Sequence, residues 1–200
     1  MTMKTSHPRE ERTVVLVKPD GVKRGLIGEI IHRFEQRGLK VIALKMIWAT
    51  RQEMDSHYPK DEAWVKRVGE KTAKTYEQYG YDLQTELGTT DLLKIGTMVR
   101  GWLLDFMTSG PVVKMVIQGV HAVDMVRKIA GPTMPYLAEM GTLRGDYSVD
   151  SAAAANKEKR SVHNILHASE TAAEAENEIK NWFTKDELHA YKRMEEDIQF

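Results

Sequence analysis

Short apolar runs alternate with amphipathic stretches along the chain and predict strands that alternate with helices. Residues 13–17 and 112–117 are β-branched runs bounded by turn residues, which is typical of buried strands. A further strand is expected over 41–48. A helix is predicted where apolar residues recur at the spacing of one helical face, at Ile27, Ile30, Ile31 and Phe34. Gly38 follows where that helix is expected to end.

The same alternation continues through the second half of the chain. Helices are predicted around 99–107 and 121–130, and a brief strand at 164–167. Ser169 is expected to cap the next helix, which ends near Trp182. Two stretches place a Glu three residues after a Thr, as a helix-starting capping box does: Thr50-Arg51-Gln52-Glu53 and Thr184-Lys185-Asp186-Glu187. The second is expected to begin a terminal helix.

Two segments interrupt this pattern and are predicted to be insertions. Residues 60–98 are rich in Lys, Glu, Thr and Tyr, and are expected to lie on the core rather than within it. Inside this segment a weakly amphipathic helix is predicted from Val65, Val68, Thr72 and Tyr76, and Thr90 is expected to cap a short helix. Residues 151–160 are Ala-rich and then charged, and form the smaller insertion.

The order of elements predicts the fold class. The strands are few and closely spaced, which argues against a large doubly wound sheet. We expect one domain over residues 1–200 of the α+β class, with the two insertions added to it. Its predicted plan is ferredoxin-like βαββαβ, a four-stranded antiparallel sheet with helices packed on one face.

Composition narrows the classes of function. Lys plus Arg and Asp plus Glu both total 29, so the chain is neither a strongly basic nucleic-acid coat nor an acidic tail. The absence of cysteine excludes disulfides, zinc–thiolate sites, iron–sulfur clusters and thiol nucleophiles. No N-terminal apolar segment resembles a secretory signal, and no apolar run is long enough to span a membrane. A cytoplasmic location without membrane contact is therefore expected.

The strongest candidate for chemistry is His167, which lies between a predicted strand and a helix start. The chain has no glycine-rich phosphate loop, but a helix N-terminus attracts anions. Lys18, Arg127 and Arg144 offer positive charge for the same pocket, and this set suits phosphoryl transfer through a phosphohistidine. Glu178 lies about three helical turns after His167, so it reaches the ring only if the chain reverses after the strand. Against this hypothesis, a lone His is more often a structural or surface residue.

Ordered blocks of sequence cover nearly the whole chain outside the two insertions. They are Val17-Lys18-Pro19-Asp20-Gly21-Val22, Arg24-Gly25-Leu26-Ile27-Gly28-Glu29-Ile30, Ser56-His57-Tyr58, Ser109-Gly110-Pro111-Val112-Val113 and Gly141-Thr142-Leu143-Arg144-Gly145-Asp146. The last is Asn164-Ile165-Leu166-His167-Ala168-Ser169-Glu170, followed by Glu178-Ile179 and Trp182-Phe183. In content and order these blocks resemble the nucleoside diphosphate kinase family.

The resemblance implies a reaction and a set of site residues. It implies a ping-pong transfer between nucleoside triphosphates and diphosphates, with His167 as the phosphorylated residue and Glu178 fixing its tautomer. The implied nucleotide-binding residues are Lys18, Val99, Arg127, Thr133, Arg144 and Asn164, and Tyr58 is implied beside the nucleophile. Mg²⁺ is expected on the nucleotide's phosphates without a metal site on the protein, and a homo-oligomer is expected.

The sequence also departs from the family pattern. Ala168 replaces a common Gly, His163 replaces a common Arg, and Val99 stands where an aromatic residue usually contacts the base. Trp64, Trp102 or a Tyr of the larger insertion is an alternative base contact. The insertions are consistent with a cap over the base, a subunit contact or solvated decoration. Two other functions remain: a regulatory relative with little turnover, and a single-strand nucleic-acid binder, which zero net charge and the lack of paired strand aromatics disfavour.

Overall fold

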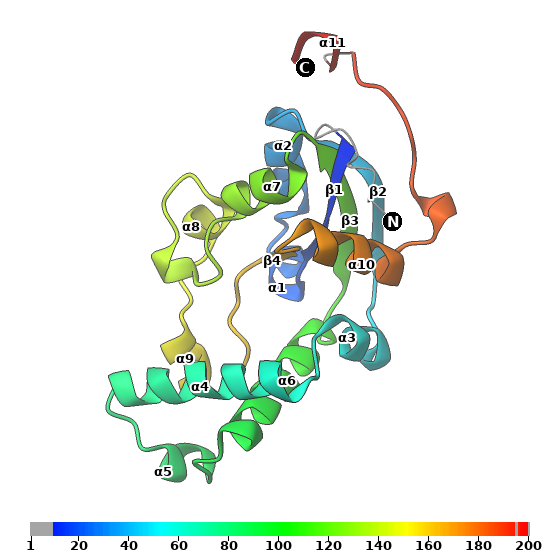
Figure 1. Cartoon of the computed structure of the whole chain (residues 1–200). Coiled ribbons are helices and arrows are strands. Elements are labelled where there is room, and N and C mark those ends of the chain that lie inside the picture. The colour runs from blue at the N-terminus through cyan, green and yellow to red at the C-terminus, as the bar shows by residue number, and fades with distance from the viewer. Residues whose placement is uncertain (1–9, 195, 200) are drawn as a thin grey trace.

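Residues 10–194 and 196–199 are described by a computed structural model of the chain (Figure 1). Within them, four strands form one antiparallel sheet in the order β2-β3-β1-β4. The strands are β1 (Glu11–Val17), β2 (Lys40–Ile47), β3 (Val112–Gly119) and β4 (Leu166–Ala168). The predicted α+β, ferredoxin-like plan is confirmed.

Helices cover both faces of the sheet, so the prediction of one covered face was wrong. One face is covered by α2 (Ile27–Gln36) and α7 (Ala122–Ala130). The other is covered by α3 (Arg51–His57), α10 (Ala172–Trp182) and the C-terminal half of α6 (Leu92–Met107). The physical reason lies in β1, where residues 14–17 point to the two faces in turn and are all apolar and fully buried. Shorter turns of helix join these elements: α1 (Pro19–Lys23), η2 (Pro135–Leu137) and α8 (Leu143–Tyr147).

The larger predicted insertion folds as helices that project from the sheet (Figure 1). It contains α4 (Glu62–Gln78), α5 (Leu83–Leu87) and the start of α6, and it has a small core of Tyr76, Leu87 and Ile95. The short helix expected after Thr90 and the separate helix expected around 99–107 are one continuous helix, α6, and Asp91 rather than Thr90 caps it. The Asp91 carboxylate accepts the main-chain N–H groups of Leu93 and Lys94, which start α6 at Leu92.

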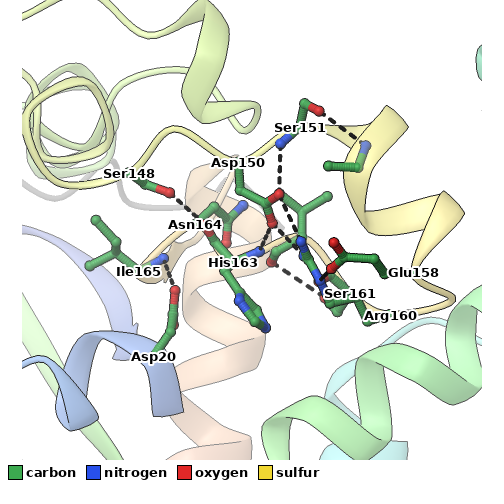
Figure 2. Close-up of polar contacts among 12 residues, drawn as sticks. Asp20, Ser148, Asp150, Ser151, Glu158, Arg160, Ser161, His163, Asn164 and Ile165 are labelled. Carbon is green, nitrogen blue, oxygen red and sulfur yellow. Dashed lines mark hydrogen bonds and ion pairs between the residues drawn. The ribbon is translucent and has the colours of Figure 1, made fainter.

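The smaller insertion forms α9 (Ala152–Lys157) and is closed at its base by Asp150 (Figure 2). The Asp150 carboxylate accepts the main-chain N–H groups of Ser151 at 2.9 Å and His163 at 2.7 Å. It also pairs with both terminal nitrogens of Arg160, at 2.6 and 3.1 Å. Both ends of the insertion are therefore bonded to the Asp150 side chain, which fixes the backbone that leads into β4.

The chain after α10 returns along the outer strand β2. Thr184 N–H donates to the Glu187 carboxylate at 3.1 Å, but this pair begins a short 3₁₀ turn, η3 (Lys185–Glu187), and not the predicted terminal helix. The backbone after η3 instead bonds to the edge of β2, where the His189 N–H donates to the Ile42 carbonyl at 2.8 Å. A last short helix, α11 (Glu196–Gln199), follows. No helix in the described part of the chain combines the length and apolar character needed to cross a membrane.

Candidate active site

A cavity of about 670 Å³ lies between the end of the sheet and the two insertions. Cavities of this size hold small-molecule ligands. The predicted site residues that line it are Lys18, Tyr58, Val99, Arg127, Thr133, Arg144, Asn164 and His167. Glu178 is not part of the lining; it lies behind His167. The fold thus gathers residues from both ends of the chain at one place.

His167 at the centre of β4 is held by Glu178. The His167 Nε2 atom lies 2.8 and 3.0 Å from the two Glu178 carboxylate oxygens. The contact forms because the chain reverses after β4 and α10 runs back along β1. Burial would raise the pKa of Glu178, but the hydrogen bond and the charge from His167 outweigh it, so this pKa lies below its usual value. The carboxylate therefore accepts the Nε2 proton and leaves the Nδ1 lone pair free.

Ser169 supports this pair and does not cap the following helix as predicted. The helix α10 is capped by Thr171, whose hydroxyl accepts the Glu174 N–H. Ser169 is fully buried, and its hydroxyl donates to Glu178 Oε2 at 2.6 Å and accepts the Val14 N–H at 3.2 Å. A buried hydroxyl with these partners fixes the Glu178 carboxylate against β1.

His57 is a part of the site that the sequence did not single out. Its ring centroid lies 4.6 Å from that of His167. The Trp182 indole N–H donates to His57 Nδ1 at 3.3 Å, and burial with the neighbouring His167 lowers the pKa of His57 to about 3. His57 is therefore neutral near pH 7. The available signal was its place beside Tyr58 in the Ser56-His57-Tyr58 block.

The groups able to ligate a metal in this part of the site are already joined by hydrogen bonds. His57, His167 and Glu178 each offer an atom within 4.8 Å of the others. The nitrogen of His57 accepts from Trp182, and that of His167 donates to Glu178. These contacts join the three side chains in one hydrogen-bonded cluster around His167.

Lys18 and Asn164 are tied together on the floor of the cavity. The Lys18 ammonium donates to Asn164 Oδ1 at 2.7 Å, and the Asn164 amide N–H donates to the Thr133 carbonyl at 2.9 Å. Burial, together with the charge of Arg144, lowers the pKa of Lys18 to about 8. This cation is therefore desolvated, and the low dielectric around it strengthens its attraction for an anion.

Arg144 both supplies charge and holds the backbone on either side of the cavity next to His167. Its guanidinium donates to the carbonyls of Asn164 at 3.1 Å, Gly131 at 2.6 Å and Leu166 at 2.7 Å. Burial and the neighbouring Arg127 lower the pKa of Arg144 to about 10, so it remains protonated at neutral pH. Arg127 comes from the last turn of α7 and lines the same cavity.

Tyr58 borders the same cavity from the end of α3. Burial, with a further contribution from Glu178, raises the pKa of Tyr58 well above its usual value. Its hydroxyl is buried, and no described residue offers it a hydrogen bond. Tyr58 therefore carries a neutral phenol whose proton has no partner within the described chain.

The comparisons with known proteins agree with this geometry. A sequence model of the family described as nucleoside diphosphate kinase matches residues 11–67 and 97–188. The nucleoside diphosphate kinase of Pyrobaculum aerophilum is 47% identical over 178 residues, which cover 89% of this chain and 97% of that protein. That of Pyrococcus furiosus is 38% identical, covering 90% and 88%. The chain belongs to the nucleoside diphosphate kinase family.

Solved structures of nucleoside diphosphate kinases resemble the whole fold. The crystal structure of the Pyrobaculum aerophilum enzyme superposes with a TM-score of 0.87 at 46% identity, over 90% of this chain and 98% of that one. A transition-state mimic of the Borrelia burgdorferi enzyme with bound vanadate and ADP gives 0.74 at 34% identity, over 95% and 96%. Members of this family are enzymes that transfer phosphate between nucleotides. The family model leaves out residues 68–96, which lie inside the larger expected insertion.

The departures from the nucleoside diphosphate kinase pattern have local explanations. Ala168 fits because the backbone there does not take a positive φ; the left-handed residue of this segment is Ile165, at φ 73°. His163 is outside the cavity lining, and its ring lies 4.8 Å from that of Phe106. Val99 does line the cavity, but the aromatic substitutes weighed from sequence, such as Trp102 and Tyr76, do not.

Asp20 and Gly21 hold the backbone at Ile165, which takes a φ of 73° two residues before His167. The sequence suggested only a turn at these two residues. The Asp20 carboxylate accepts the Ile165 N–H at 3.0 Å, and the Ile165 carbonyl accepts the Lys18 N–H at 2.8 Å. A Cβ at Gly21 would lie 2.8 Å from the Ile165 carbonyl oxygen. The Lys18-Pro19-Asp20-Gly21 turn and the Asn164–Ile165 backbone are therefore packed as one unit.

Proposed function

We propose that this nucleoside diphosphate kinase transfers the terminal phosphate of a nucleoside triphosphate to a nucleoside diphosphate by a ping-pong mechanism, through a phosphohistidine on His167. The pairing of His167 with Glu178 carries the proposal. Because Nε2 lies 2.8 Å from the carboxylate, the ring proton resides on Nε2 and Nδ1 keeps its lone pair. A neutral imidazole in a cavity lined by cations is suited to attack phosphorus.

The reaction divides into two half-reactions. In the first, the Nδ1 lone pair attacks the terminal phosphorus, an N–P bond forms, and the bond to the bridging oxygen breaks to release a nucleoside diphosphate. The ring gains positive charge, which Glu178 stabilises while Nε2 keeps its proton. In the second, a terminal phosphate oxygen of another diphosphate attacks the same phosphorus, and the N–P electron pair returns to Nδ1.

The surrounding side chains are proposed to bind the nucleotide along its length. Lys18, Arg127 and Arg144 offset the charge of the phosphates, and loss of one such contact costs about 2–4 kcal/mol of transition-state stabilisation. Thr133 and Asn164 contact the phosphates and sugar hydroxyls, Tyr58 stands beside the nucleophile, and Val99 contacts the base. All of these residues line the cavity.

Mg²⁺ is proposed to arrive on the nucleotide. Glu139 is the single carboxylate among the described residues that line the cavity, and several of the others are cationic. Mg²⁺ prefers oxygen ligands, so this lining suits an ion held by phosphate oxygens rather than by the chain. When bound, the ion neutralises charge on the phosphates.

Phosphate labelling tests the proposal. We expect incubation with γ-phosphate-labelled ATP to give a protein-bound phosphate that is labile in acid and stable in base, and His167→Ala to abolish it. His163→Ala is the matched control and keeps the label, because that ring lies outside the cavity lining. A wild-type protein that binds ATP and stays unlabelled would instead indicate a regulatory relative.

Self-association is also proposed. Leu44 and Met46 near the end of β2 and Trp48 just after it stand at alternate positions and are 50%, 53% and 66% exposed. An apolar edge strand of this kind is a ready surface for a second copy of the chain. We propose a homo-oligomer that uses this edge, acting in the cytosol on soluble nucleotides.

A further inference from the structure

The two insertions, far apart in sequence, contact each other beside the cavity. The Tyr76 hydroxyl of α4 donates to the Asn156 carbonyl of α9 at 2.8 Å. The Lys157 ammonium pairs with Glu86 and lies 4.6 Å from the centroid of the Tyr81 ring. The insertions therefore form one unit. We use the term composite wall for the uncharged part of the cavity lining made by insertion residues Val68, Thr72, Ala152 and Asn156 together with Val99 and Leu103 of α6.

The composite wall presents polar groups that lack partners in the described chain. Asn156 is 8% exposed and Thr72 is 6% exposed, and both line the cavity. Asn156 uses its main-chain carbonyl for Tyr76, but no hydrogen bond joins its side-chain amide, or the Thr72 hydroxyl, to any described residue. Neither group is among the fully buried polar atoms of the described residues that lack a partner, so both open onto the space of the cavity, where a ligand can reach them.

The chemical groups on the composite wall are complementary to those of a nucleobase. This step rests on the proposed function, in which Lys18, Arg127 and Arg144 take the phosphates and Val99 takes the base. The six residues of the composite wall carry no charge and combine aliphatic surface with an amide and a hydroxyl. Lys71 and Arg160 line the cavity beside them, and Arg160 is paired with Asp150. A base has the complementary form, with apolar faces and an edge of donors and acceptors.

We infer that the two insertions together form the base subsite, and that the side-chain amide of Asn156 hydrogen-bonds the edge of the base. Val68 and Val99 contact its faces in place of an aromatic ring, and Thr72 adds a second hydrogen bond. An amide is both donor and acceptor, and every base edge offers both. The subsite therefore binds bases in general and does not select one strongly.

Asn156→Ala tests the inference by calorimetric titration of ADP, GDP, CDP and UDP, with inorganic tripolyphosphate as a ligand that has no base. We expect the affinity for the four diphosphates to fall about two- to tenfold and that for tripolyphosphate to stay unchanged. Asn181→Ala, an exposed asparagine on α10, is the matched control with no effect. Unchanged diphosphate affinities, or an equal loss for tripolyphosphate, would overturn the inference.

Asn156→Asp separates base contact from a merely structural role. It keeps the shape, removes the amide donor and adds a negative charge that repels all four diphosphates and tripolyphosphate alike. The affinities of the four diphosphates relative to one another should therefore change by at least about threefold if the side chain contacts the base. A structural role would weaken all four alike. The phosphate label on His167 distinguishes the two proposals: a labelled enzyme with no Asn156 effect contradicts the base subsite alone. An unlabelled enzyme in which the Asn156 variants weaken diphosphate binding as expected contradicts the phosphohistidine alone.

Discussion

Single residues around β1 and β4 show what sequence reasoning can and cannot reach. Lys18 and His167 were singled out from their places at the ends of predicted strands and from the family resemblance, and both line the cavity. The place of His57 beside His167 was not predicted, because the residues around it in the sequence do not distinguish a buried neutral histidine from the other histidines. Its role depends on Trp182, which donates to it from a distant helix at 3.3 Å. Such a contact exists only once the fold has formed.

Lys18 gives the residue-scale prediction, a loss of nucleotide affinity in alkali. Its pKa in the folded chain is lowered to about 8, and the charged form exists below that value. As pH rises through 8 the free site loses a positive charge, so the affinity for a non-hydrolysable triphosphate should fall about tenfold per pH unit above it. Calorimetry from pH 7 to pH 10 measures this. Lys18→Met should bind weakly at pH 7 and show no such decline; a wild-type affinity constant to pH 9.5 contradicts the prediction.

At the scale of elements, α4 and α6 cross with their backbones in contact. A Cβ at Gly69 would lie 1.9 Å from the Leu92 carbonyl oxygen, and one at Gly96 would lie 1.9 Å from that of Val65. The helix through Val65 and Tyr76 was predicted from its period. Its partner was not, because a glycine in a helix reads as a weak point until the neighbouring backbone is known. The second covered face of the sheet was missed for a similar reason. Residues 14–17 of β1 are apolar on both faces, and this pattern does not identify the helices that cover each face.

Gly69→Ala is expected to destabilise the protein. The new methyl group meets main chain, which cannot rotate away, so the helices must separate at a cost of about 1–3 kcal/mol. Gly101→Ala on α6 is the control, since nothing lies within 4 Å of its new Cβ, and it should be neutral or slightly stabilising. Urea unfolding measures both. Equal free energies of unfolding for the two variants would show that the backbones of α4 and α6 are not in close contact.

At the scale of the whole molecule, β2 is an edge strand that the chain itself covers in part. The C-terminal segment pairs with Ile42, but the stretch from Leu44 to Trp48 stays exposed. Sequence alone indicated only that the family forms oligomers, because the exposure of these side chains depends on the order of strands in the sheet.

The double change Leu44→Lys and Met46→Lys should reduce self-association. Charges along an edge strand oppose pairing with another copy. In sedimentation velocity we expect the wild type above the 22.8 kDa of one chain, and the variant shifted toward it. Met140→Lys, at a residue 80% exposed in the segment before α8, should leave the assembly intact. A wild type that sediments as a monomer, or a variant identical to it, would refute this interface.

The closure of residues 151–160 on Asp150 has a consequence for how such an enzyme can change. Because both ends of that stretch are bonded to one carboxylate, residues between them can be substituted, added or removed while the backbone that leads to His167 keeps its place. For the proposed base subsite, this means that nucleotide preference can change without a change in the residues proposed to bind the phosphates.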